Sequence, residues 1–282
     1  MEGAIRVLRE EDIDFAVSVC ALEGWDYESQ DIRRIQELEP AGCFVAWRGE
    51  VPVGFVSTAY YGTLAWIGNV IVVPEARKGG VGAGLVRHAL NYLQDRGAQS
   101  VRLESYLKTI AFYDHLGFQK EFPNRRFEGL MEGARSLEVQ PFLSQDLEEV
   151  ARFDEWFFGV DRARYLDRWQ KDFPKAHWLY REAGELRGFV GGTTSGSYVE
   201  VGPLVALPRH PEVACALLET VAQQHPGKRL ALSVPAPNVP SAHVCEDFGM
   251  KETFWTMRSF FGKMKPAGEI QGVYALGGLE RG

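Results

Sequence analysis

The sequence lacks the features of a membrane or nucleic-acid-binding protein. No uninterrupted apolar run reaches the roughly 18 residues that a membrane span requires. There is no block of basic residues and the net charge is -7, which argues against nucleic acid or an anionic membrane as a partner and favours a cationic substrate. Residues 1–3 do not begin a secretory signal peptide. We therefore expect a cytoplasmic protein.

Cysteine is also scarce. The chain has 4 cysteines, which lie far apart without the spacing of metal ligands: Cys20, Cys43, Cys215 and Cys245. None of the 6 histidines pairs with a cysteine or a carboxylate at ligand spacing, so we expect reduced thiols and no metal. Hydrophobic residues make up 45% and charged residues 24% of the chain, which is ordinary for a folded protein of one or two domains.

The most informative segment, residues 67–85, joins a predicted strand to a predicted helix through a glycine-rich turn. Ile71, Val72 and Val73 are β-branched and favour a buried strand, which ends at a proline. Glycines let main-chain N–H groups approach a ligand closely, and a helix N-terminus favours an anion. We therefore expect this turn to bind a diphosphate, with contacts from Arg77, Lys78, Gly79, Gly80, Val81, Gly82 and Ala83.

The residue order within the turn narrows the type of ligand. No Lys-Ser or Lys-Thr follows the last glycine, so a P-loop is not expected, and the glycines do not follow the dinucleotide-binding order. With Arg77, Gly80, Gly82 and Leu85 in register, the segment resembles the acetyl-CoA pyrophosphate loop of the GNAT N-acetyltransferase superfamily. The alternative is an ordinary strand-turn-helix connection whose glycines serve packing alone.

A second segment is similar to another GNAT signature, in which a helix bearing a tyrosine ends at Gly-Phe. Residues 109–115 form a predicted helix that Gly117 and Phe118 close, and Tyr113 occupies the tyrosine position. Two positions depart from the pattern, because Tyr106 stands where the family commonly has Asn and Thr109 where it commonly has Ala. Tyr106 is still expected to line the route of the pantetheine arm.

The resemblance implies an α/β fold, with a mostly antiparallel, splayed mixed sheet flanked by helices. Acetyl-CoA would enter the opening that forms after the fourth strand. Residue patterns predict strands over 4–8, 43–48, 53–60, 64–73 and 100–104, and helices over 11–23, 31–38, 81–95 and 109–115.

The chain also repeats itself. Residues 44–56 align with 178–190, and residues 67–74 align with 201–208, at an offset of 134 residues. Further on, Gly117-Phe118 aligns with Gly249-Met250 at an offset of 132 residues. We therefore expect two tandem GNAT-like domains, residues 1–133 and 134–282. The alternative is an unrelated, β-rich second domain.

The second copy lacks the chemistry of the first. No glycine occupies the turn after Arg209, Pro211 removes an amide, and Glu212 would place a negative charge beside a diphosphate. Asn238 keeps the family residue, but Cys245 stands where the tyrosine would be. We expect a degenerate domain that has lost its cofactor, completes the acceptor pocket and buries a face of the first domain.

The resemblance implies direct transfer of the acetyl group without an acyl-enzyme. Main-chain amides around Ile71, Val72 and Val73 would hold the pantetheine and polarise the carbonyl. Tyr113 would protonate the leaving thiolate, with Tyr106 as the substitute; the alternative for Tyr113 is a packed aromatic side chain.

The residues around the acceptor are candidates of a different kind. Glu104 and Asn69 could orient a water that removes the amine proton, although a strand-end glutamate is commonly just solvated. Trp25, Asp26 and Tyr27 lie in the segment that covers the acceptor in this family. Acidic and aromatic side chains suit an ammonium group, and further carboxylates stand nearby, namely Glu23, Glu28 and Asp31. The alternative for this segment is a solvated connection.

Two classes of function follow. The first is an acetyl-CoA-dependent N-acetyltransferase that acts on a primary amine of a small molecule. The second is a non-catalytic acyl-CoA sensor or partner-binding module, and acetylation of a protein amine is a third possibility. A protein acceptor predicts an open groove, whereas a small acceptor predicts a pocket closed by the second half. The chain is expected to be a monomer or a homodimer.

Overall fold

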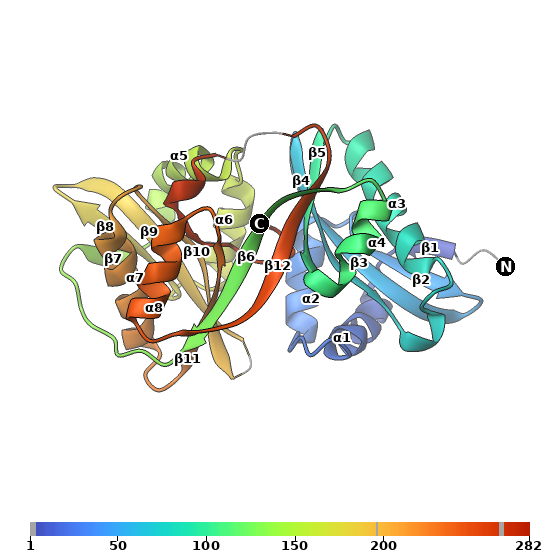
Figure 1. Ribbon diagram of the computed structural model, residues 1–282, viewed down its shortest axis with the longest axis horizontal. Helices are drawn as coiled ribbons and strands as arrows, with labels where there is room; N and C mark the ends of the chain where they lie inside the picture. The colour runs from blue at the N-terminus through green and yellow to red at the C-terminus, as the bar shows by residue number, and fades with distance from the viewer. Residues whose placement is uncertain (1–3, 196, 265–267) are drawn as a thin grey trace.

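The protein consists of two halves with the same order of elements (Figure 1). Its structure, a computed structural model, describes residues 4–195, 197–264 and 268–282. The signal-peptide prediction concerns residues 1–3, which lie outside the described residues. The first half contains β1 Ala4–Val7, α1 Ile13–Ala21, α2 Ser29–Leu38, β2 Phe44–Arg48, β3 Val51–Tyr61, β4 Leu64–Val72, α3 Val81–Asp95, β5 Ser100–Tyr106, α4 Ile110–His115 and β6 Gln119–Gly129.

The second half repeats this series and adds one short strand. It contains β7 Val139–Pro141, α5 Leu147–Phe158, α6 Ala163–Asp172, β8 His177–Glu182, β9 Glu185–Ser195, β10 Tyr198–Ala206, α7 Pro211–Gln224, β11 Arg229–Pro235, α8 Val239–Asp247, β12 Lys251–Gly262 and β13 Val273–Ala275. Strands β3 and β9, and likewise β4 and β10, occupy positions that differ by the predicted 134 residues. The tandem α/β fold is therefore confirmed.

The observed elements differ from the predicted ones mainly at their ends. Strand β5 continues to Tyr106, so Glu104 lies inside the strand and not at its end. Helix α1 begins at Ile13, because residues 10–12 form a separate 3-10 turn whose Asp12 accepts a hydrogen bond from the Arg9 amide. Among the described residues, no helix is both long and apolar enough to cross a bilayer. All four cysteines are free.

The two halves exchange their last long strands. Within the described residues the strands form one 13-stranded sheet, in which β6 of the first half pairs with β11 of the second, and β12 of the second half pairs with β5 of the first. Strands β6 and β12 also pair with each other and run side by side through the middle of the molecule (Figure 1). The predicted boundary near residue 133 separates the two repeats in sequence, but the two packed units share strands across it.

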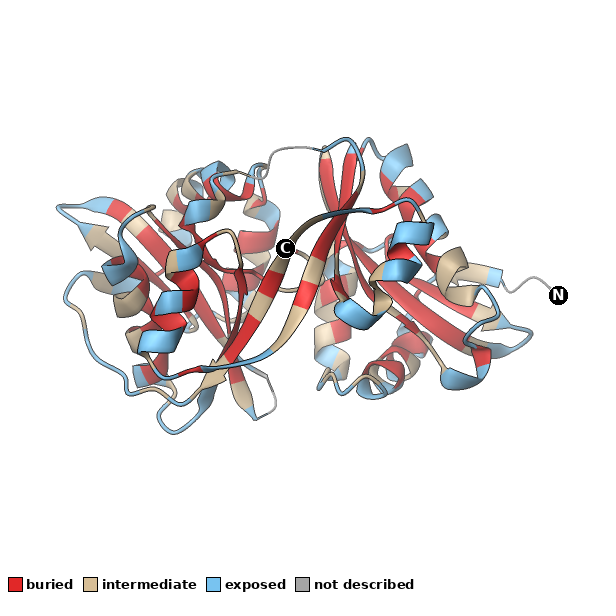
Figure 2. Cartoon of the chain, viewed as in Figure 1, coloured by how far each residue is buried: buried red, intermediate tan, exposed pale blue. Residues whose placement is uncertain are grey.

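The exchanged strands are buried where they cross between the halves (Figure 2). They carry charged residues that are paired inside the protein. Arg258 of β12 contacts Glu104 of β5, with Nε and Oε1 2.6 Å apart. Arg126 of β6 contacts Glu200 of β10, with Nη1 and Oε1 2.6 Å apart. These pairs join segments that are distant in sequence and tie the two halves together.

The sheet of the first half opens between β4 and β5. These two parallel strands pair only through Leu64–Trp66 and Ser100–Arg102, and beyond those residues they diverge. The predicted opening after the fourth strand is therefore present.

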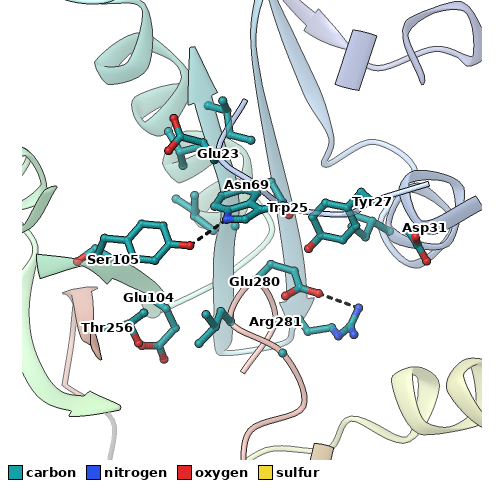
Figure 3. A pocket seen from close by; sticks show the side chains of 18 of the residues that line it. Glu23, Trp25, Tyr27, Asp31, Asn69, Glu104, Ser105, Thr256, Glu280 and Arg281 are labelled. Atoms are coloured by element: carbon teal, nitrogen blue, oxygen red, sulfur yellow. Dashed lines mark hydrogen bonds and ion pairs between the residues drawn. The ribbon is translucent and has the colours of Figure 1, made fainter. Parts of the chain in front are cut away.

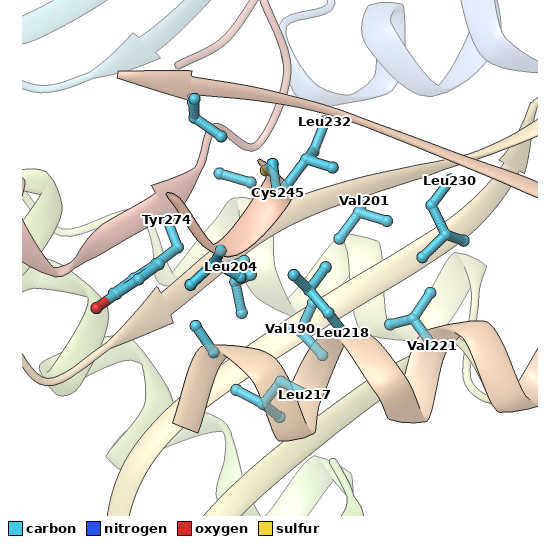
Figure 4. Close-up of a cluster of buried hydrophobic side chains, with 14 of the residues drawn as sticks. Val190, Val201, Leu204, Leu217, Leu218, Val221, Leu230, Leu232, Cys245 and Tyr274 are labelled. Atoms are coloured by element: carbon cyan, nitrogen blue, oxygen red, sulfur yellow. The ribbon is translucent and has the colours of Figure 1, made fainter. Parts of the chain in front are cut away.

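The corresponding opening in the second half is filled. Strands β10 and β11 pair over Tyr198–Glu200 and Arg229–Ala231, and then β13 lies between them. The β13 strand pairs antiparallel with β10, and the amide of Leu276 donates to the Ser233 carbonyl of β11 over 2.9 Å. Tyr274 and Cys245 join the apolar core around this strand (Figure 4).

Candidate active site

The glycine-rich turn lies at one end of the β4–β5 opening. Gly80 adopts a left-handed conformation with φ of 78° and caps the N-terminus of α3. A side chain built on Gly80 would meet no atom within 4 Å, so the turn has an open face. The first-turn amides of Val81, Gly82 and Ala83 have no carbonyl four residues earlier within the helix to bond. Open space and free amides at a helix start fit the diphosphate of coenzyme A.

The edge of β4 provides a further main-chain donor. The Val73 amide donates to the Val53 carbonyl of β3 over 3.0 Å, so it is not available to a ligand, in contrast to the expectation for this residue. Because N–H directions alternate along a strand, the Val72 amide points to the opposite edge, which faces the opening. Consistent with this direction, the Val72 carbonyl accepts a hydrogen bond from Arg77 Nε over 2.9 Å.

A bulge in β4 turns the strand at Asn69. The register with β3 shifts between Phe55 and Ser57, and Asn69 has a φ of 51°, in the left-handed region. Its Oδ1 accepts a hydrogen bond from Ser57 Oγ over 2.7 Å, which holds the side chain in a buried position. Asn69 is therefore placed at the point where β4 leaves β5, as a buried and hydrogen-bonded residue.

Tyr113 and Tyr106 both line the opening, but they differ in their partners. Tyr113 is 8% exposed and packs edge-on against Phe112 and Phe118. Burial raises the pKa of Tyr113 well above its usual value, so the hydroxyl is protonated at neutral pH. The Tyr106 hydroxyl instead accepts a hydrogen bond from Trp25 Nε1 over 2.9 Å (Figure 3).

Glu104 lines the same pocket but is engaged on both sides. Its Oε1 lies 2.6 Å from Arg258 Nε, and its Oε2 accepts a hydrogen bond from Asn124 Nδ2 over 2.6 Å. The side chain is fully buried, and burial raises the pKa of Glu104 while the Arg258 charge opposes this. The solvated alternative for Glu104 is therefore wrong, and the carboxylate belongs to a buried ion pair.

The acidic segment before α2 divides into capping and lining residues. Asp31 accepts a hydrogen bond from the Glu28 amide over 2.8 Å, so this pair caps α2. Glu23 contacts Arg77, with Oε1 and Nη2 2.8 Å apart, at the mouth of the glycine turn. Asp26 is exposed and lines the pocket.

Trp25 and Tyr27 form an aromatic wall on this side of the pocket (Figure 3). Their rings meet edge to face with centroids 6.4 Å apart. The pKa of Tyr27 is raised well above its usual value, mainly by burial and then by the charge of Glu280, so its hydroxyl is protonated.

These residues surround one pocket of about 1000 Å³. Most of the predicted site residues line it: Trp25, Asp26, Tyr27, Asn69, Ile71, Val72, Arg77, Lys78, Gly80, Gly82, Ala83, Glu104, Tyr106 and Tyr113. Val73, Gly79 and Val81 are not among the lining residues. Residues of the second half complete the wall, including Tyr165 and Trp169 of α6 and Phe254 of β12. The second half therefore contributes to the wall of this pocket.

Sequence reasoning missed the C-terminal segment, residues 278–281, which enters this pocket. Glu280 and Arg281 stand among the lining residues, and Arg281 Nη1 lies 2.9 Å from Glu280 Oε1 (Figure 3). The segment follows the repeated region and contains no motif, so no local signal could have placed it here.

In the part of the second half that the structure describes, no comparable opening remains between β10 and β11. Helix α7 begins at Pro211, and Glu212 in its first turn contacts His210, with Oε1 and Nδ1 2.8 Å apart. Strand β13 fills the space between β10 and β11, and Asn238 Nδ2 donates to the Val273 carbonyl of that strand over 2.9 Å. A peptide strand of the chain itself therefore lies where the pantetheine arm would otherwise pass.

Within residues 4–195, 197–264 and 268–282, no group of three or more His, Cys, Asp or Glu side chains is arranged to hold a metal ion.

Comparisons with known proteins agree with this architecture. A family model described as "Acetyltransferase (GNAT) family" matches residues 7–118, and one described as "Acetyltransferase (GNAT) domain" matches residues 150–275. Holothin acyltransferase from Pseudoalteromonas sp. (strain SANK 73390) is 26% identical over 265 residues, covering 92% of this chain and 88% of that protein.

Two further proteins resemble this chain, one over part of its sequence and the other in its fold. Mycothiol acetyltransferase from Thermobispora bispora is 32% identical over 129 residues, covering 40% of this chain and 44% of that protein. A crystal structure from Pyrococcus horikoshii, of a protein proposed to be an acetyltransferase, superposes with a TM-score of 0.83 at 24% identity, covering 100% of this chain and 96% of that chain. This last likeness concerns the fold.

Proposed function

Because this chain belongs to the GNAT family of acetyltransferases and carries two GNAT domains in tandem, we propose that its first domain transfers an acetyl group from acetyl-CoA directly to the primary amine of a small molecule. The contribution of the second half to the pocket wall supports a small acceptor. Helix α6, strand β12 and residues 278–281 of the second half line the pocket opposite the residues of the first half. A protein substrate would need an open groove on that side.

The chain's own residues offer the groups that this reaction needs. Acetyl-CoA supplies the acetyl group as a thioester. In this proposal the amides at the start of α3 would hold the diphosphate, and the Val72 amide would donate a hydrogen bond to the carbonyl oxygen. The Tyr113 hydroxyl is protonated at neutral pH and lines the pocket, so we assign it the protonation of the leaving sulfur; burial raises its pKa further above the usual value.

The acceptor side of the pocket favours a cation with an apolar body. Aromatic rings of Trp25, Tyr27 and Trp169 line it together with the carboxylate of Asp26. Aromatic faces attract an ammonium group and also bury apolar surface. An amine carried on a ring or an aliphatic chain could contact the aromatic rings through its apolar part and the Asp26 carboxylate through its ammonium group.

Two measurements on the full-length protein test this proposal. Calorimetry measures acetyl-CoA binding, and thiol release is then followed with a panel of polyamines, amino acids, amino sugars, aminoglycosides and a peptide with a free N-terminus. We expect binding and release with at least one small amine. Binding without release by any amine would favour a sensor, and release with the peptide alone would favour a protein acceptor.

A further inference from the structure

The C-terminal segment of the second half crosses into the site of the first half. Strand β13 fills the opening of the second half, and the chain then continues to residues 278–281, which line the pocket of the first. The segment folds back on itself, since the Gly282 amide donates to the Gly278 carbonyl over 2.9 Å and the Gly277 amide to the Gly282 carbonyl over 3.1 Å. Such a closed turn positions its side chains firmly.

Both halves anchor this turn. Tyr61 of β3 donates a hydrogen bond to the Arg281 carbonyl over 3.1 Å. From the second half, Arg162 Nη1 donates to the Gly282 carbonyl over 2.9 Å, and Tyr165 donates to the Gly277 carbonyl over 3.3 Å. Arg162 is itself held by Asp154, with Nε and Oδ2 2.6 Å apart. The turn is therefore fixed relative to both β3 and α6.

Glu280 lies directly against the bulge of β4. A Cβ atom on Gly68 would stand 2.7 Å from the Cα of Glu280, so only glycine permits this approach. Gly68 precedes Asn69, where β4 turns away from β5 and the opening begins. The Glu280 side chain is 14% exposed, and Figure 3 shows its carboxylate in the space between Tyr27 and Glu104.

The charged and titratable surroundings leave Glu280 as an accessible carboxylate. Its ion pair among the described residues is with the adjacent Arg281, with Oε1 and Nη1 2.9 Å apart. Four neighbouring groups are neutral at neutral pH, and burial, followed by the charge of Glu280, raises their pKa values further: Cys20, Tyr27, Tyr61 and Tyr165. Glu104, by contrast, has both oxygens engaged by Arg258 and Asn124.

We propose that Glu280, delivered by the second half, is the carboxylate that binds the acceptor ammonium in the first half's site and removes its proton. This inference rests on the proposed acetyl transfer. One N–H bond of the ammonium breaks, and the proton passes to the Glu280 carboxylate and then to solvent. The freed lone pair forms the C–N bond as the C–S bond breaks, and the electron pair of that bond remains on sulfur.

The remaining protons balance within the same site. Sulfur takes its proton from the Tyr113 hydroxyl. The second proton that nitrogen loses on becoming an amide restores Tyr113 through solvent. One proton is released overall for each amide formed. The degenerate half thereby contributes a catalytic residue in place of the cofactor site that it lacks.

The variants Glu280→Gln and Glu280→Asp of the full-length protein test this role, with the amine on which the wild type is most active. Glu280→Gln should lower kcat at neutral pH by roughly 100-fold or more, the usual worth of a general base. The Kd for acetyl-CoA should stay within twofold of wild type, and Glu280→Asp should retain part of the rate. Glu148→Gln, on α5 and 87% exposed, is the matched control.

A pH series separates a base from a structural residue. Above the pKa of the acceptor amine the substrate is already neutral, so Glu280→Gln should regain most of the wild-type rate there. A kcat for Glu280→Gln within twofold of wild type at neutral pH would overturn the inference. So would a loss that persists at high pH, since that pattern marks a structural role. If the wild type releases no thiol with any amine, the proposed function fails and this inference fails with it.

Discussion

Replacing Glu104 by glutamine distinguishes a buried structural ion pair from a free catalytic base. The Glu104 side chain is 0% exposed and its partner Arg258 is 4% exposed. Glutamine keeps one oxygen for Arg258 but turns its amide group toward the donor Nδ2 of Asn124, so the Arg258 charge stays buried without its counterion. Breaking such a pair costs about 3–5 kcal/mol, and we expect the lower part of that range because one hydrogen bond survives.

Thermal unfolding measures this effect directly. A loss of about 3 kcal/mol corresponds to a fall in Tm of roughly 6–12 °C for a chain of this size. The double variant with methionine at both positions 104 and 258 should recover most of the loss, because it removes both charges from the interior. Below its melting temperature, Glu104→Gln should keep a turnover near that of the wild type.

Two outcomes would refute this reasoning. If the Tm of Glu104→Gln stays within 2 °C (about 1 kcal/mol or less) of the wild type while turnover collapses, Glu104 is a free base and not a structural residue. If the double methionine variant is less stable than either single variant, the two side chains do not stabilise the protein as a pair.

Three other perturbations probe the cofactor turn, the proton donor and the core. Gly82→Leu should raise the Kd for acetyl-CoA at least tenfold in calorimetry (about 1.4 kcal/mol), because the leucine side chain enters the pocket. Gly84→Ala, whose position does not line the pocket, is the control. Equal Kd values for Gly82→Leu and the wild type would contradict the binding of acetyl-CoA at this turn. Tyr113→Phe should lower kcat by roughly 100-fold with little change in KM or Tm, and an unchanged kcat would remove Tyr113 from the mechanism. Burial lowers the pKa of His177 to about 3, whereas in the unfolded chain it is about 6.5. As the pH falls between these two values, the unfolded chain binds a proton that the folded protein does not. The free energy of unfolding therefore decreases over this range, by up to roughly 5 kcal/mol. Urea unfolding at pH 7 and pH 4.5 should show that the free energy of unfolding changes less with pH in His177→Leu than in the wild type. An equal change in the two proteins would contradict the lowered pKa of His177.

The glycine-rich turn could be predicted from the sequence because its requirements are local. A β-branched strand, a proline and a run of glycines occupy consecutive positions, and each constrains the main chain directly. The internal repeat was equally visible, since two copies of one fold need similar spacing of strands and turns. Pro211 and Glu212 predict in the same way that the second copy has lost its cofactor.

The strand exchange and the path of the C-terminal segment could not be inferred in this manner. The residue patterns predict no strand over residues 119–129 or 251–262, where β6 and β12 lie. A strand pattern would also not say which neighbour each strand pairs with, because main-chain hydrogen bonding is the same for either partner. Glu104 likewise reads as a strand-end glutamate until the strand of Arg258 is placed beside it.

The sequence alone therefore determined the family and the two-copy architecture, and it predicts a cofactor site in the first half, since these depend on residues close together in the chain. Tertiary structure decided which carboxylates are buried, which are accessible, and that the second half reaches into the first. Those outcomes depend on contacts such as Glu280 with Gly68, whose partners are far apart in sequence and meet only when the whole sheet has formed.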